Sequence, residues 1–257
     1  MRTHTQTVVA QFDPKSQAYL TSAVHAAGPD LKLASQLVQQ PGLPRGALLD
    51  VGCGAGHLAF ALAPHFERAV AVDPAPAMLA TVAAAAAQRG LPQIQVQQAI
   101  AENLPFAAGS FHVVGSRYSA HHWRDVPAAL REMRRVATPG AMLLMIDLMG
   151  DERPLVDTHL QAIELLRDPS HVRDYSPSQW RCMLRDAGFD VQREAFWPTR
   201  LQFSSWVERM QTAPVSVAVI RTLLADAAQE VRTGLGVEPD GSFIPHTGLF
   251  WARAAAT

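Results

Sequence analysis

The feature of this sequence that most restricts its fold is a regular alternation of short apolar segments with helical ones between residues 46 and 149. Five segments have the length and near-continuous hydrophobicity of buried strands: 47–51, 68–73, 94–100, 111–120 and 141–149. Three intervening segments have helical spacing or helix-ending residues: 57–66, 76–90 and 125–140. Strands that alternate with helices in this way predict an α/β fold, in which helices cover both faces of a mostly parallel sheet.

The parts of the chain on either side are expected to complete a single domain over residues 1–257. Residues 1–45 are mostly helical in pattern and are expected to form a lid over the core at 46–149. Residues 150–257 are expected to supply further helices and the last strands. Four segments are predicted there: a helix at 176–189, a strand at 191–203 that Pro198 confines to a sheet edge, one helix at 216–236, and a last strand at 243–254.

Composition narrows the class of protein. The chain has 257 residues, 48% of them hydrophobic, which suits one substantial core. A formal net charge of -1 argues against nucleic acid as an obligatory partner. The two cysteines cannot form a disulfide framework, and the amino terminus has no secretory pattern, so we expect a cytoplasmic protein. The most apolar segment, 141–149, is too short to span a membrane and contains Asp147.

The loop after the first strand reads Asp50-Val51-Gly52-Cys53-Gly54-Ala55-Gly56 and allows three interpretations. It is a tight turn, a dinucleotide-binding loop, or a loop that holds an amino-acid end of a ligand. The dinucleotide pattern G-x-G-x-x-G has its third glycine one place later. A pyrophosphate also requires bare N–H groups, whereas Asp50 would repel it and would attract an ammonium group. The glycines let the chain pass under a ligand, and Cys53 is expected to fill space.

Asp73 ends the second strand, where an acidic residue in such folds accepts hydrogen bonds from both hydroxyls of a ribose. This feature is shared by proteins that bind NAD and by proteins that bind S-adenosylmethionine, and an exposed turn aspartate is the alternative. An oxidoreductase receives no support from the rest of the chain, because no Tyr-x-x-x-Lys pair follows the fourth strand.

The segment Ala99–Val114, AIAENLPFAAGSFHVV, resembles the third-strand loop of the UbiE/YcgJ-like methyltransferases (methyltransferase type 11), with its A-E-x-L-P-F and S-F-D patterns. The resemblance extends over nearly the whole chain, including 116–147 and 168–189. It implies a Rossmann-like class I methyltransferase with S-adenosyl-L-methionine as cofactor. The implied sheet is seven-stranded with an antiparallel last strand, and N-terminal helices cover the cofactor. Two positions depart from the family pattern, because Ile100 and His112 stand where the family often has aspartate.

The resemblance makes residues 46–149 the cofactor-binding core and implies a set of contacts with the cofactor. The expected cofactor-binding residues are Tyr19, Asp50, Gly52, Cys53, Gly54, Gly56, Asp73, Pro74, Met78, Ile100, Ala101, Glu102 and Arg117. At Ile100 the side-chain bond to adenine is missing, so we expect packing and the N–H of Ala101 to serve there. Tyr19 and Arg117 also have structural interpretations, as core packing and as a partner of a nearby carboxylate.

The candidates for catalysis follow the fourth strand: Tyr118, His121 and His122. The two histidines are adjacent and should point in different directions, so no shared metal is expected. Either one of them faces the cofactor or acceptor, or their hydrogen bonds fix the loop. His171 and Arg173 lie in a turn-rich stretch that is either a substrate-facing loop or a surface turn.

Transfer of a methyl group from a sulfonium is an in-line displacement that depends on alignment in a site closed to water. The N/D-P-P-[YFW] motif of many nucleic-acid amino methyltransferases is absent after the fourth strand. The sequence therefore predicts methylation of a small molecule on oxygen, carbon or nitrogen, by a monomer or homodimer without a membrane span. The alternative is a non-catalytic S-adenosylmethionine-binding or sensor protein.

Overall fold

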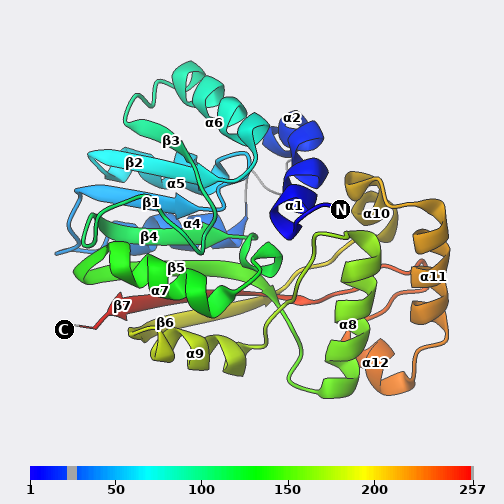
Figure 1. Ribbon diagram of the computed structural model, residues 1–257. Helices are drawn as coiled ribbons and strands as arrows, with labels where there is room; N and C mark the ends of the chain where they lie inside the picture. Colours follow the sequence, from blue (N-terminus) through cyan, green and yellow to red (C-terminus); the bar gives the residue numbers. More distant parts are fainter. Residues whose placement is uncertain (22–27, 256–257) are drawn as a thin grey trace.

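The sheet predicted from the alternation is present in the computed structural model, which describes residues 1–21 and 28–255. Seven strands lie in the order β3-β2-β1-β4-β5-β7-β6 (Figure 1). Their bounds are β1 Ala47–Val51, β2 Arg68–Asp73, β3 Ile94–Gln98, β4 Phe111–Arg117, β5 Ala137–Met149, β6 Phe189–Pro198 and β7 His246–Ala254. β1 to β5 pair in parallel, whereas β7 runs antiparallel to both β5 and β6. The predicted class I methyltransferase sheet, with its antiparallel last strand, is confirmed.

Helices cover both faces of this sheet. Their bounds are α1 His4–Phe12, α2 Ser16–Leu20, α4 Pro29–Val38, α5 His57–Leu62, α6 Pro76–Gln88, α7 Val126–Val136, α8 Pro154–Arg167, α9 Pro177–Asp186, α10 Phe203–Met210, α11 Pro214–Ala225 and α12 Gln229–Gly234, with short 3-10 turns η1 Asp13–Lys15, η2 Ala63–His65 and η3 Ala120–His122. One apolar cluster joins the sheet to α7 and α9, and a second joins it to α4 and α5. A third lies among α8, α10, α11 and α12, which gather beyond one end of the sheet (Figure 1).

The N-terminal segment is helical, as expected, in the parts that the structure describes. α1 begins with a capping box, in which the Thr3 side chain accepts from the Gln6 N–H and the Gln6 side chain accepts from the Thr3 N–H. The segment expected to be mostly helical also includes residues 22–27, which lie outside the described residues. In the described part of the chain, no helix combines the length and the hydrophobicity that crossing a bilayer requires.

Two predicted elements near the carboxyl end of the chain differ from the structure. The single helix predicted at 216–236 is two helices, α11 and α12. Arg232 of α12 donates hydrogen bonds to the carbonyls of Leu224 and Ala225, so it satisfies acceptors that end α11. The edge strand begins earlier and ends earlier than predicted, at Phe189 and Pro198, and α10 starts at Phe203.

Three strands of the core also differ from their predicted lengths. β3 ends at Gln98, two residues before its predicted end. β5 begins at Ala137, where Pro139-Gly140 was expected to end a helix and the strand was expected at Ala141. The pairing shifts from Phe111–Ala137 to Val113–Met142, so an irregularity in β5 absorbs the proline and glycine. β4 ends at Arg117, and the chain then turns into η3, which carries the two adjacent histidines.

Candidate active site

A cavity opens at the carboxyl ends of β1 to β4, beneath α1 and α2. Its empty volume is about 1050 Å³ including the mouth, comparable to the largest small-molecule sites at roughly 300–1,000 Å³. We call it the main cavity. It is lined by twelve of the thirteen residues expected to bind cofactor: Tyr19, Asp50, Gly52, Cys53, Gly54, Asp73, Pro74, Met78, Ile100, Ala101, Glu102 and Arg117. Ligands of open α/β sheets bind at this edge.

The glycines of the loop after β1 have different roles. Gly52 and Gly54 both have positive φ, of +67° and +50°, and both line the main cavity. A Cβ at Gly52 would lie 1.9 Å from the Ser119 Oγ, whereas one at Gly54 would meet nothing within 4 Å. Gly56 is not part of the cavity lining; a Cβ there would lie 2.9 Å from Phe60. Gly56, the thirteenth expected residue, therefore packs closely at the start of α5, outside the cavity lining.

Asp50 is buried at the base of the loop with half of its carboxylate unsatisfied. Its Oδ2 accepts from the N–H of Ala59 at 3.0 Å, and its Oδ1 has no hydrogen-bond partner among the described residues. Burial raises the pKa of Asp50 to about 7, against the effect of the Ala59 hydrogen bond. An unsatisfied buried carboxylate oxygen that lines a cavity is suited to accept from a ligand cation.

Asp73 joins the glycine loop to the end of β2. Its Oδ2 accepts from the N–H of Gly54 and its Oδ1 from the N–H of Ala75, both at 2.9 Å. Burial raises the pKa of Asp73 to about 6, while these two hydrogen bonds lower it. Each carboxylate oxygen has a second lone pair, so the side chain can still accept from two hydroxyl groups of a ligand.

The loop after β3 lines the main cavity with the apolar side chains of Ile100 and Ala101. Position 100 therefore offers no acidic side chain to a ligand. Ile100 forms an isolated bridge with Asn103, and Ala101 next to it is buried. Glu102 also lines the cavity, but its Oε1 accepts from the backbone N–H groups of Arg124 and Asp125 at 2.9 and 3.2 Å. Its carboxylate therefore fixes the loop that follows η3.

Two helices from the N-terminus close the main cavity. The Tyr19 hydroxyl lies 3.2 Å from the Met210 Sδ in α10, and burial raises the pKa of Tyr19. The Tyr19 carbonyl contacts the His57 Nε2 at 2.9 Å. Phe12 packs edge-on against Tyr19 and against His122, with ring centroids 5.7 and 4.9 Å apart. These contacts make the predicted lid part of the cavity wall.

Arg117 and Tyr118 leave the end of β4 with structural partners. Arg117 forms a buried ion pair with Asp30 of α4 and lies 4.7 Å from the Tyr118 ring centroid. The Tyr118 hydroxyl hydrogen-bonds the Thr247 hydroxyl at 3.0 Å, and burial raises its pKa to about 12. Tyr118 also lines the main cavity, so its ring, more than its hydroxyl, is available to a ligand.

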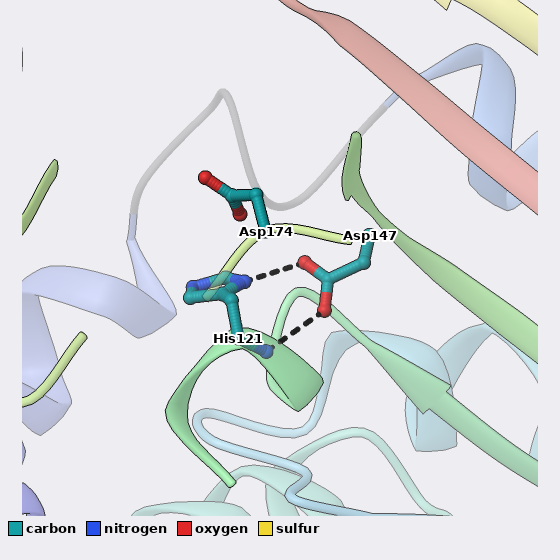
Figure 2. Close-up of side chains that lie close together, drawn as sticks. All are labelled: His121, Asp147 and Asp174. Carbon is teal, nitrogen blue, oxygen red and sulfur yellow. Dashed lines mark hydrogen bonds and ion pairs between the residues drawn. The ribbon is translucent and has the colours of Figure 1, made fainter. Parts of the chain in front are cut away.

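The two adjacent histidines point to different surroundings, as expected. His122 lines the main cavity, and its Nδ1 lies 3.1 Å from the Ser170 carbonyl. His121 is not in the cavity lining; its Nδ1 contacts the Asp147 Oδ1 at 2.5 Å (Figure 2). Burial disfavours a charge on His121, but Asp147 outweighs it and the pKa is raised to about 9. Burial and the neighbouring His121 lower the pKa of His122 to about 4.

Much of the stretch at 168–176 is buried, although Val172 within it is exposed. His171 is buried with its ring centroid 5.9 Å from that of His121, and Arg173 pairs with Asp157. Asp147 and Asp174, which lie beside His121, were not among the predicted site residues. For Asp147, its position within the apolar segment 141–149 is the one signal that the sequence offers.

Comparisons with known proteins agree with this geometry. Residues 49–145 match the family described as a methyltransferase domain. The chain is 43% identical to the uncharacterized protein YafE of Escherichia coli K12 over 80% of this chain and 99% of YafE. It is 34% identical to the uncharacterized methyltransferase YcgJ of Bacillus subtilis over 86% of this chain and 87% of YcgJ. The YcgJ crystal structure superposes with a TM-score of 0.84 at 31% identity, over 89% of this chain and 99% of that one.

A more distant relative is the ubiquinone/menaquinone biosynthesis C-methyltransferase UbiE of Rhizobium meliloti, 27% identical over 66% of this chain and 74% of that protein. The residues present fit the cofactor of these enzymes. The unsatisfied Oδ1 of Asp50 suits an ammonium group, open space beside Gly54 admits the ligand, and Asp73 offers two acceptors. From its fold, its cavity and these relatives, the chain belongs to the class I S-adenosylmethionine-dependent methyltransferases.

Proposed function

We propose that this enzyme methylates a small, mostly apolar molecule that carries a phenol- or quinol-type hydroxyl, bound in the main cavity. The observation that carries the proposal is the position of His122, an imidazole on the wall of the main cavity that lies among apolar side chains. The apolar surface comes from Val8 and Phe12 of the lid, Met78 and Ile100 of the core, and Trp123 after η3. Such walls favour an aromatic acceptor over a charged polymer.

The cofactor supplies a methyl group on a sulfonium, which needs no further activation as a leaving group. We assign Asp50 to its ammonium group and Asp73 to its ribose hydroxyls. Ile100 and the N–H of Ala101 are assigned to the adenine. Tyr19 and the rest of α1 and α2 exclude water, which strengthens these polar contacts.

His122 is assigned as the group that accepts the hydroxyl proton. If its Nδ1–H donates to the Ser170 carbonyl, 3.1 Å away, its Nε2 presents a lone pair. This Nε2 has no hydrogen bond to the described residues. Removing the proton makes the oxygen, and the ring carbon beside it, better nucleophiles, so the same group serves O- or C-methylation. The printed name of the Rhizobium meliloti relative, a quinone-pathway C-methyltransferase, supports an acceptor of this kind.

The experiment is to measure S-adenosylhomocysteine release over a panel of phenols, quinol precursors and carboxylic acids. We expect turnover with hydroxyl-bearing aromatics, and a loss of roughly 10²–10⁴-fold in kcat for His122→Gln. Binding of S-adenosylhomocysteine to that variant should change little. The matched control is His65→Gln, because His65 precedes β2 at the opposite edge of the sheet. Binding of S-adenosylhomocysteine without turnover on any acceptor would favour a sensor instead of an enzyme of this specificity.

A further inference from the structure

A second set of polar side chains is buried directly behind His122. His121 of η3, Asp147 near the end of β5 and Asp174 of the segment before α9 converge there (Figure 2). One potential ligand atom from each lies within 4.8 Å of the other two. The three residues come from separate parts of the chain, and the mechanism proposed above uses none of them.

Asp174 is the residue that requires explanation. Its side chain is 1% exposed, and neither of its carboxylate oxygens has a hydrogen-bond partner among the described residues. The His171 Nε2 lies 4.0 Å from its Oδ2, but that nitrogen already bonds the Gln161 Oε1 at 3.1 Å. A buried carboxylate without hydrogen bonds is costly, and among the described residues none donates a hydrogen bond to the Asp174 carboxylate.

Asp174 lies near other buried carboxylates, those of Asp147, Asp157 and Glu164. Because like charges repel, a cation beside Asp174 is more favourable there than a carboxylate left alone.

We propose that His121, Asp147 and Asp174 bind one divalent first-row transition-metal ion, of which Zn²⁺ is the representative. One imidazole nitrogen and two carboxylate oxygens suit Zn²⁺ or Mn²⁺, whereas Mg²⁺ and Ca²⁺ prefer oxygen ligands alone. The ion takes the place of the proton now between the His121 Nδ1 and the Asp147 Oδ1, which lie 2.5 Å apart. Tetrahedral Zn²⁺ with bonds of about 2.0–2.2 Å needs ligand atoms roughly 3.3–3.5 Å apart, so small side-chain rotations complete the site.

This site lies outside the main cavity but next to its wall. The ring centroids of His121 and His122 are 4.2 Å apart. The backbone N–H of Val172 donates a hydrogen bond to the His121 carbonyl at 2.8 Å. An ion at this position ties η3, β5 and the 168–176 segment together and holds His122 in place. Its role is one of positioning, and it does not depend on the identity of the acceptor.

The test uses untagged protein stripped with a chelator and then dialysed against Zn²⁺. We expect one zinc per chain by elemental analysis and a rise in Tm on zinc addition. Asp174→Asn and His121→Gln should lose both the bound zinc and the Tm rise. Two variants serve as controls, Asp186→Asn at an exposed residue and His65→Gln at a half-buried one. Both should retain the bound zinc and the Tm rise. Mg²⁺ at the same concentration is expected to leave Tm unchanged.

Asp174→Asn keeps the test informative if His121→Gln fails to fold, because it removes a buried negative charge with little change of shape. Its metal-free Tm should equal or exceed that of the stripped wild type. No zinc uptake by the wild type would overturn the proposal and leave a proton on Asp174 as the explanation. Equal zinc uptake by wild type and Asp174→Asn, or a Tm rise with Mg²⁺ in place of Zn²⁺, would overturn it as well.

Discussion

Replacing Gly52 by alanine isolates the contribution of the glycine loop to the main cavity. Gly52 has φ of +67°, and a Cβ built there lies 1.9 Å from the Ser119 Oγ. The backbone conformation costs an alanine about 1–2 kcal/mol. The overpacking costs a further 1–3 kcal/mol or so. The free energy of unfolding should therefore fall by roughly 2–5 kcal/mol.

The matched control is Gly109→Ala. Gly109 has φ of +64°, but a Cβ there meets nothing within 4 Å, so only the backbone cost of about 1–2 kcal/mol applies. The two variants are compared by urea denaturation, and calorimetry with S-adenosylhomocysteine follows. The Ser119 Oγ accepts from the Trp123 Nε1 at 3.1 Å, and both residues line the cavity, so only Gly52→Ala should weaken binding. Equal losses of stability in the two variants would refute the steric argument.

Two further predictions concern the acidic residues of the main cavity. Asp73→Ala should cost about 1.5–3 kcal/mol of S-adenosylhomocysteine affinity in calorimetry, because charged hydrogen-bond acceptors are lost; an unchanged Kd would mean that the ribose is held elsewhere. Asp50, with its pKa raised to about 7 by burial, is largely protonated at pH 5 and charged at pH 8. Since the charged form attracts an ammonium group, affinity should rise as pH increases through about 7, and a flat profile for the wild type would remove Asp50 from that role. Asp50→Asn should abolish the rise.

Two strands beside the site, β1 and β2, could be predicted to the residue because local signals bound them. β1 lies between Gly46 and Gly52, and β2 ends at Asp73 before Pro74. Glycine and proline interrupt regular structure through their own backbone properties, which do not depend on distant contacts. The resemblance to known methyltransferases then supplied the number of strands and the direction of the last one.

The break between α11 and α12 could not be predicted in the same way. Residues 226–228 are Asp-Ala-Ala, which favour or tolerate a helix, and the end of α11 depends on hydrogen bonds from Arg232 to its final carbonyls. β5 was predicted too short because Pro139-Gly140 signals a stop, while pairing with β4 accommodates both residues in an irregular register. Tertiary contacts decide both cases.

The same distinction between local signals and tertiary contacts holds for the residues of the candidate site. Asp50, Asp73 and the glycines lie at or just after the ends of strands that meet at one edge of the sheet, so their type and position in the chain suffice to predict them. Asp147 and Asp174 could not be predicted, because their meeting with His121 depends on how the segment after α8 folds back toward η3. No spacing within the chain reports that contact.

The most direct test of this account is a crystal structure with S-adenosylhomocysteine and an acceptor that supports turnover. We expect the cofactor product in the main cavity, with its ammonium group at Asp50 and its ribose at Asp73, and the acceptor hydroxyl within hydrogen-bond distance of the His122 Nε2. An acceptor bound outside the main cavity, or with its hydroxyl away from His122, would contradict the proposed function.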